Sequence, residues 1–149
     1  MRPLPTIAVL VSLSLTSAFA QKKLALKDLP AEAQKTIQAE LKGGEIKKIG
    51  RETEHGVTQY EVETTLNGKH RDFNVDTKGK LLLVEEETTL EAIPAPAKAA
   101  IVKKVADGKL TVVELFIRGG ETMYEATYRT KGGKKLEALF KADGTETKN

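Results

Sequence analysis

Polar and apolar positions follow two different spacings along this chain, and each spacing predicts one kind of element. In residues 29–41, Ala33, Ile37 and Leu41 recur at every fourth position, which predicts a helix with one buried stripe. From Tyr60 to Leu66 every second residue is uncharged, and the residues between them are mostly charged. This alternation predicts a strand that buries one face and exposes the other.

The pattern occurs twice at one fixed offset. Matching positions include Leu29 and Ile93, Pro30 and Pro94, Ile37 and Ile101, Tyr60 and Tyr124, and Gly68 and Gly132. Such self-similarity predicts one supersecondary unit that is used twice. We therefore expect two similar units, residues 29–91 and 92–149, joined by a link that contains Pro94 and Pro96.

Short turn sequences set the expected pairing of the strands. Asn67-Gly68, His55-Gly56 and Gly119-Gly120 each suit a two-residue hairpin loop, whereas Lys131-Gly132-Gly133 suits a three-residue loop. Closing these loops predicts four cross-strand pairs: Ile49 with Val62, Val62 with Phe73, Phe116 with Met123, and Ala126 with Ala138. The alternation fails between Leu81 and Val84, so the sequence does not decide which of these residues point inward.

The predicted fold class is α+β, with two tandem helix-plus-antiparallel-meander units. In each unit the helix is expected to pack on one face of a three- to four-stranded sheet. The fourth strand of the second unit would be short or missing, because few residues follow Gly144. The sequence decides neither whether the two sheets are continuous nor the oligomeric state.

Residues 1–20 have the three parts of a secretory signal peptide. Arg2 provides a basic start, and a short apolar run leads to a small-residue site that ends at Ala20. We expect cleavage after Ala20 and a periplasmic or secreted protein, with residues 21–28 as a tether. A buried amino-terminal helix or strand is the alternative interpretation. Because no cysteine follows the cleavage site, no stable membrane anchor is expected.

Composition excludes several classes of site. The chain has no Cys, and its 24 Lys and Arg nearly balance its 21 Asp and Glu. Disulfides and thiolate metal sites are therefore excluded, and we expect no nucleic-acid partner. Residues 29–91 are net acidic and residues 92–149 net basic, which indicates either drift on two solvated surfaces or a dipolar molecule that steers its partner.

The mature region lacks the groups that most catalytic sites require. The last serine of the chain is Ser17, inside the predicted signal peptide, so neither a serine nor a cysteine nucleophile follows it. The two histidines, His55 and His70, lack the spacing of common zinc-binding motifs. We predict no enzymatic activity, no catalytic residues, no bound metal and no cofactor.

One acidic surface leaves a second hypothesis open. Glu61 and Glu63 alternate on one predicted strand, while His70, Asp72 and Asp76 alternate on its neighbour. Calcium prefers such oxygen ligands, although a flat strand face presents them with poor geometry. The alternative function is therefore a cell-envelope sensor of a small ligand or cation, and a solvated sheet face is the simpler interpretation.

Phe116 and Met123 are unusual for the face on which we expect them. Their predicted pairing places both on the side of the sheet that faces away from the helix. At the repeat offset the first unit has a polar pair there instead, Glu52 and Gln59. An exposed apolar pair of this kind predicts an anchor for a partner, unless another part of the molecule or a second copy covers it.

Five motifs in order resemble the PepSY and PepSY-like domain family: Leu29-Pro30, Gly44-Glu45-Ile46, Tyr60-Glu61-Val62, Asn67-Gly68 and Val75-Asp76-Thr77-Lys78-Gly79. Two such units in tandem are similar to the fold of the beta-lactamase inhibitory protein, over essentially all of residues 29–149. The second unit departs from the motifs, with Tyr124-Glu125-Ala126 at its strand. The resemblance implies an exported peptidase inhibitor or modulator without catalytic residues. The bridging cysteines and enzyme-gripping loops of the inhibitory protein have no match here, so inhibition of a beta-lactamase is not implied.

Together these observations predict an exported, non-enzymatic binding or regulatory protein. It would engage a protein partner through exposed sheet faces, and the resemblance implies a peptidase as that partner. The expected partner-binding residues are Phe116, Met123, Arg118, Arg129, Glu61 and Glu63. In this hypothesis the apolar pair anchors the partner, while the charged residues set its orientation and encounter rate.

Overall fold

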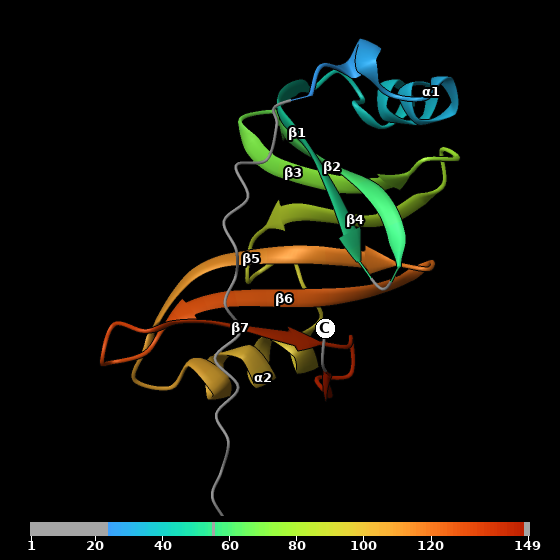
Figure 1. Ribbon diagram of the computed structural model, residues 1–149. Helices are drawn as coiled ribbons and strands as arrows, with labels where there is room; N and C mark the ends of the chain where they lie inside the picture. Colours follow the sequence, from blue (N-terminus) through green and yellow to red (C-terminus); the bar gives the residue numbers. More distant parts are fainter. Residues whose placement is uncertain (1–23, 55, 148–149) are drawn as a thin grey trace, which may run out of the picture.

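The computed structural model describes residues 24–54 and 56–147 of the chain (Figure 1). Its elements are η1 Leu26–Asp28, α1 Ala31–Glu40, β1 Glu45–Glu54, β2 Val57–Leu66, β3 Lys69–Asp76, β4 Leu81–Thr88, α2 Ala95–Val105, β5 Lys109–Arg118, β6 Glu121–Arg129, β7 Lys135–Phe140 and β8 Glu146–Thr147. The predicted signal peptide, the start of the tether and His55 lie outside the described residues.

All eight strands form one antiparallel sheet in the order β1 to β8. The prediction of two tandem units, each with its own three- to four-stranded sheet, is therefore wrong. The pairing of β4 with β5 joins the two halves, from Leu83 opposite Arg118 to Thr88 opposite Val113. This pairing satisfies backbone groups that two separate sheets would leave open at these edges. Because α2 lies between β4 and β5 in the sequence, no short turn sequence predicts that these strands pair.

The strand registers predicted from the turns are confirmed. The observed pairs include Ile49 with Val62, Val62 with Phe73, Phe116 with Met123, and Ala126 with Ala138. Asn67 and Gly68 have φ angles of 53° and 80°, the left-handed values that a two-residue type I′ turn requires. The expected short fourth strand of the second half is β8, which has two residues.

Both helices cover the same face of the sheet. The stripe of each helix has an exposed fraction of 0%, at Ala33 and Ile37 in α1 and at Ala97 and Ile101 in α2. Along β5, Val113 belongs to the cluster under α2, whereas Ile117 packs against the cluster under α1. Residues four apart in a strand share a face, so both helices lie on one side, at opposite ends of the sheet (Figure 1). We call the other side the helix-free face.

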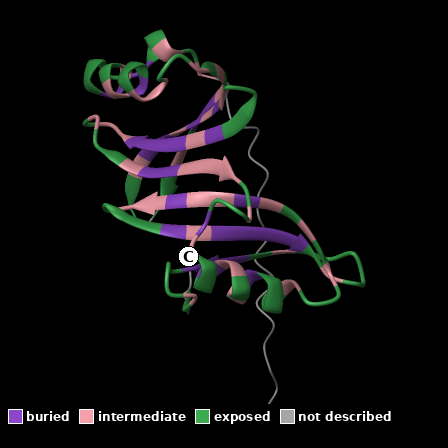
Figure 2. Ribbon diagram, turned by 180° about the vertical axis from the view of Figure 1, so that it is seen from behind, coloured by how far each residue is buried: buried purple, intermediate pink, exposed green. Residues whose placement is uncertain are grey.

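Two apolar clusters fill the space between the helices and the sheet, and a small third cluster lies on the helix-free face. This third cluster consists of Leu83, Phe116, Met123 and Leu139, from four neighbouring strands. Figure 2 shows the buried positions concentrated in the strands, while much of the outer surface of the helices is exposed. The order of the elements thus produces one covered face and one face open to a ligand or partner.

Arg71 is a buried charge that fastens the end of α1 to the sheet. Its exposed fraction is 1%, and its guanidinium lies 5.2 Å from the centre of the Phe73 ring. It donates hydrogen bonds to the Glu40 carbonyl oxygen at 2.7 Å and to the Glu40 carboxylate at 2.6 Å. It also reaches the Glu86 carboxylate at 3.3 Å. Since Glu40 ends α1, the positive charge also complements the helix dipole.

Candidate functional site

All six residues predicted to bind a partner lie on the helix-free face. One row of cross-strand partners runs through Glu63, Asp72, Glu85, Phe116 and Met123, and a second through Glu61, Asn74, Leu83 and Arg118. Arg129 lies six positions along β6 from Met123 and so shares its face. The structure therefore places the six residues on one face but spreads them from β2 to β6.

Phe116 is not exposed, in agreement with the alternative that another part of the molecule covers it. Its exposed fraction is 0% and that of Met123 is 9%. Leu83 and Leu139 complete the cluster around the ring, and the Arg118 guanidinium lies 4.9 Å from the ring centre. Sequence analysis did not identify the residues that provide this cover, because it left the direction of Leu83 open and did not assign Leu139 to this face. A partner can therefore touch Arg118 but not the Phe116 ring beneath it.

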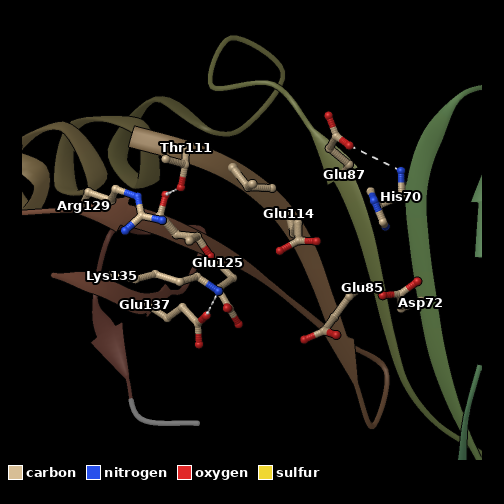
Figure 3. A pocket seen from close by; sticks show the side chains of 12 residues that line it. His70, Asp72, Glu85, Glu87, Thr111, Glu114, Glu125, Arg129, Lys135 and Glu137 are labelled. Atoms are coloured by element: carbon tan, nitrogen blue, oxygen red, sulfur yellow. Dashed lines mark hydrogen bonds and ion pairs between the residues drawn. The ribbon is translucent and has the colours of Figure 1, made fainter. Parts of the chain in front are cut away.

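Beside the third cluster, the helix-free face is hollowed over five neighbouring strands, β3 to β7 (Figure 3). This acidic hollow has a volume of about 470 Å³. It is lined by six carboxylates, three basic side chains and three other residues: Asp72, Glu85, Glu87, Glu114, Glu125 and Glu137; His70, Arg129 and Lys135; Thr111, Val112 and Thr127. The carboxylates outnumber the basic groups, so the hollow favours a positively charged ligand.

Like charges stand directly opposite one another in this hollow. Glu87 is the cross-strand partner of Glu114, and Glu114 is the partner of Glu125. Carboxylates in such positions destabilise a sheet by repulsion. Glu125 has an exposed fraction of only 8%, and no hydrogen bond or ion pair joins its carboxylate to any described residue. This arrangement of carboxylates lowers the stability of the folded protein.

The pKa values of the carboxyl groups reflect this cost. Burial, followed by repulsion from Glu125 and Glu114, raises the pKa of Glu85 to about 7. Burial, with repulsion from Glu137 and Glu114, likewise raises the pKa of Glu125 to about 7. Burial also raises the pKa of Glu114 and of Asp72. Glu85 and Glu125 therefore change charge near neutral pH.

The five residues of the cation-sensor hypothesis do not form one cluster. His70 and Asp72 line the acidic hollow, whereas the Glu63 carboxylate accepts a 2.6 Å hydrogen bond from the ammonium group of Lys48. Asp76 instead accepts backbone N–H groups from the turn that follows it. Within residues 24–54 and 56–147, no group of three His, Cys, Asp or Glu side chains is placed to hold a metal ion.

An apolar groove of about 320 Å³ lies at the other end of the helix-free face. Val57, Leu81, Leu82 and Leu83 line it together with Arg118. Val57 and Leu81 are exposed to 45% and 36%, and the other exposed large hydrophobic residue of the described chain is Val102 on α2. Sequence analysis did not predict this groove, although the irregular alternation from Leu81 to Val84 lies on β4, a strand that lines it.

None of the described helices is long and apolar enough to cross a membrane. No family model and no curated protein matches the sequence. PepSY membership therefore stays a prediction.

Solved structures do match the fold. A protein from Bacteroides eggerthii, whose name assigns it provisionally to the periplasm, is 14% identical, with a TM-score of 0.66 over 80% of this chain and 86% of that one. A DUF2874 family protein from Bacteroides ovatus is 13% identical, with a TM-score of 0.62 over 80% and 85%. A BLIP-like protein from Bacteroides fragilis is 20% identical, with a TM-score of 0.55 over 76% and 82%. These likenesses support the expected resemblance to the fold of the beta-lactamase inhibitory protein (BLIP).

Proposed function

We propose that this chain is an exported, non-enzymatic binding protein that docks a partner protein on its helix-free face. The observation that carries the proposal is the apolar groove, which is lined by Val57, Leu81 and Arg118 and in which Val57 and Leu81 are exposed. Exposed apolar side chains that gather in one groove are typical of a protein-binding site. In this proposal the groove anchors the partner, and not Phe116 and Met123 as the sequence predicted.

Charged residues next to the groove would orient the partner. The Arg118 guanidinium rests on the buried Phe116 ring and also lines the groove. Across the sheet, Arg118 belongs to the same row of cross-strand partners as Glu61. Glu63 and Arg129 lie farther away and would act on the encounter rate more than on the affinity.

The partner class and the location form the finer part of the proposal. The motifs that resemble PepSY domains favour a peptidase, inhibited or modulated by occlusion. The solved structures with this fold include one BLIP-like protein and one provisionally assigned to the periplasm, which supports a periplasmic binding protein. The signal-peptide pattern of residues 1–20 is consistent with that location.

Substitution of the groove tests the proposal. The tagged mature chain and its Val57→Ser/Leu81→Ser variant would be used to capture proteins from the native extracytoplasmic fraction, and each captured protein would be purified and titrated. We expect one protein to bind the wild-type chain and to lose at least roughly tenfold in affinity for the variant. A captured peptidase would then be assayed for inhibition.

Val102→Ser is the matched control, because Val102 is exposed to 54% on the opposite face and the change is chemically the same. It should bind the partner as the wild type does. Equal binding of a partner by the wild type and the groove variant, with both folded by circular dichroism, would exclude the groove as the docking site.

A further inference from the structure

Three carboxylates lie on neighbouring strands of the acidic hollow. These are Glu85 on β4, Glu114 on β5 and Glu125 on β6, which no hydrogen bond or ion pair joins to another described side chain. The other carboxylates of the hollow differ. Asp72 accepts the Thr64 N–H at 3.1 Å, Glu87 accepts the His70 N–H at 3.3 Å, and Glu137 pairs with Lys135 at 2.9 Å.

Basic side chains of the hollow compensate these three groups only in part: Lys135 attracts Glu125, and His70 attracts Glu114. Lys135 forms its ion pair with Glu137 (Figure 3). The Arg129 guanidinium donates to the Gly133 carbonyl oxygen at 3.1 Å. Glu125 points most clearly to a cationic ligand, because the residue is 8% exposed, its carboxylate makes no hydrogen bond to a described residue, and it lines the hollow. The partial burial of this carboxylate carries a desolvation cost, which a bound cation would offset.

The donor set suits an ammonium group better than a metal ion. Ammonium presents three N–H donors, so carboxylates approaching from three strands can each accept one. Its hydrogen bonds are about 2.8 Å long, whereas calcium requires oxygens at about 2.4 Å. Among the described residues no group of three His, Cys, Asp or Glu side chains is placed to hold a metal ion, whereas Glu114 stands opposite Glu125 and both act electrostatically on Glu85. A guanidinium is flat and prefers one carboxylate in a two-pronged pair.

We propose that the acidic hollow is a binding site for an alkylammonium group, held by Glu85, Glu114 and Glu125. Two sources carry this group, a lysine side chain of a partner protein and a free polyamine. With a partner lysine, the inference rests on the proposed function and adds a second contact to the docking surface. With a polyamine, the hollow acts independently of the groove.

Binding should strengthen as the pH rises, because the carboxylates must be ionised to accept ammonium hydrogen bonds. Besides Arg129 and Lys135, the charged and titratable groups that face Glu85 and Glu125 are Glu61, Asp72, His70, Glu87, Glu114 and Glu137. Burial, followed by repulsion from acidic members of this set, raises the pKa of both carboxyls to about 7. For each carboxyl that must ionise, affinity should be about tenfold higher at pH 8 than at pH 6.

Calorimetric titration of the mature chain tests the proposal with two probes, spermidine and an acetylated, amidated penta-lysine peptide, at low ionic strength. We expect binding of at least one probe, and a loss of roughly tenfold or more in Glu125→Gln and in Glu85→Gln. Glu32→Gln is the matched control, since it removes the same charge from an exposed position on α1 and should bind as the wild type does. The tighter of the two probes identifies the source.

Several results would overturn the proposal: no binding of either probe at pH 8, equal losses in Glu125→Gln and Glu32→Gln, or displacement of the probe by equimolar calcium. Circular dichroism verifies folding, and Glu114→Gln replaces either variant that fails it. The groove variant Val57→Ser/Leu81→Ser should bind both probes normally. If neither probe binds while the chain still captures a partner through the groove, this inference alone is refuted. If the groove variant captures a partner as well as the wild type does while the probes bind normally, the proposed function alone is refuted.

Discussion

At the residue scale, the surroundings of a side chain decide whether Phe116 can contact a partner. Its register opposite Met123 follows from the Gly119-Gly120 turn, and both lie on the helix-free face. Leu83 and Leu139 nevertheless surround the ring, and its exposed fraction falls to 0%. Phe116 is therefore a core residue that supports Arg118.

Phe116→Ala should accordingly reduce stability rather than only binding. We expect the free energy of unfolding to fall by about 3 kcal/mol, because a buried phenyl ring is lost and the small cluster can collapse only partly. Urea denaturation followed by circular dichroism measures this change. Val102→Ala, at a residue exposed to 54%, should change stability by less than about 0.5 kcal/mol. An equally small effect at Phe116 would mean that the ring is exposed in solution.

Glu125 makes stability depend on pH in a direction that can be derived. Its pKa is raised to about 7 in the folded chain, above the ordinary value of 4.5 for a glutamate. The folded state therefore holds the extra proton between these two pH values, and stability falls as the pH rises through this window. Glu125→Gln should be more stable than the wild type at pH 8, by about 1 kcal/mol after allowance for solvent screening, and equally stable below pH 4.5.

Differential scanning calorimetry at both ends of this range measures the effect, with Glu32→Gln as the comparison. A Glu125→Gln variant that is less stable than the wild type at pH 8 would show that the carboxylate makes a favourable contact in the empty protein.

At the element scale, turns fasten the helices to the strands in both halves of the chain. Gly79 has a φ of +81°, and a Cβ atom there would lie 2.6 Å from the Glu32 carbonyl oxygen at the start of α1. Gly144 has the same relation to the Pro96 carbonyl oxygen in α2, at 2.7 Å. The same local contact thus occurs twice, although the strands belong to one sheet.

Gly79→Ala should destabilise the chain by more than Gly68→Ala. Both residues have φ near +80°, but a Cβ atom at Gly68 would meet nothing within 4 Å. Gly68→Ala should therefore cost only the backbone strain, about 1 kcal/mol, and Gly79→Ala that strain plus the displacement of α1. Thermal unfolding of the two variants measures the difference. Equal melting temperatures would show that the turn can move away from α1 without cost.

At the scale of the whole molecule, the pairing of β4 with β5 makes the two halves one body. Val84 and Ile117 face each other across this seam, and both contribute to the cluster under α1. The acidic hollow also spans the seam, since β3 and β4 provide some of its residues and β5 to β7 the others. Neither half alone contains the hollow.

We therefore expect one cooperative unfolding transition. In urea, backbone amides of β2 and β3 should exchange hydrogen with the same limiting free energy as those of β5 and β6, because the seam couples the halves. Hydrogen exchange measured by mass spectrometry or NMR checks this. Two separate transitions would mean that each half is stable without the seam.

Much of the candidate site could be predicted from the sequence, and the features that could not be predicted have physical causes. Alternation along each strand assigned Glu61, Arg118 and Met123 to one face correctly, since the two-residue period is local. Burial of Phe116 could not be predicted, because it depends on Leu83, which reaches it through the pairing of β4 with β5, and on Leu139 in β7, two strands away. The pairing of Glu87 with Glu114 could not be predicted from the sequence either, because it forms between β4 and β5.

The sequence by itself determined the helices, the hairpin registers and the two-fold recurrence of the pattern, because turns and periodicity act over a few residues. Only the tertiary structure decided that β4 and β5 join, that both helices share one face, and that carboxylates from both halves meet in one hollow. These features depend on contacts between residues far apart in the chain, which are selected by burial of apolar surface and by satisfaction of strand edges.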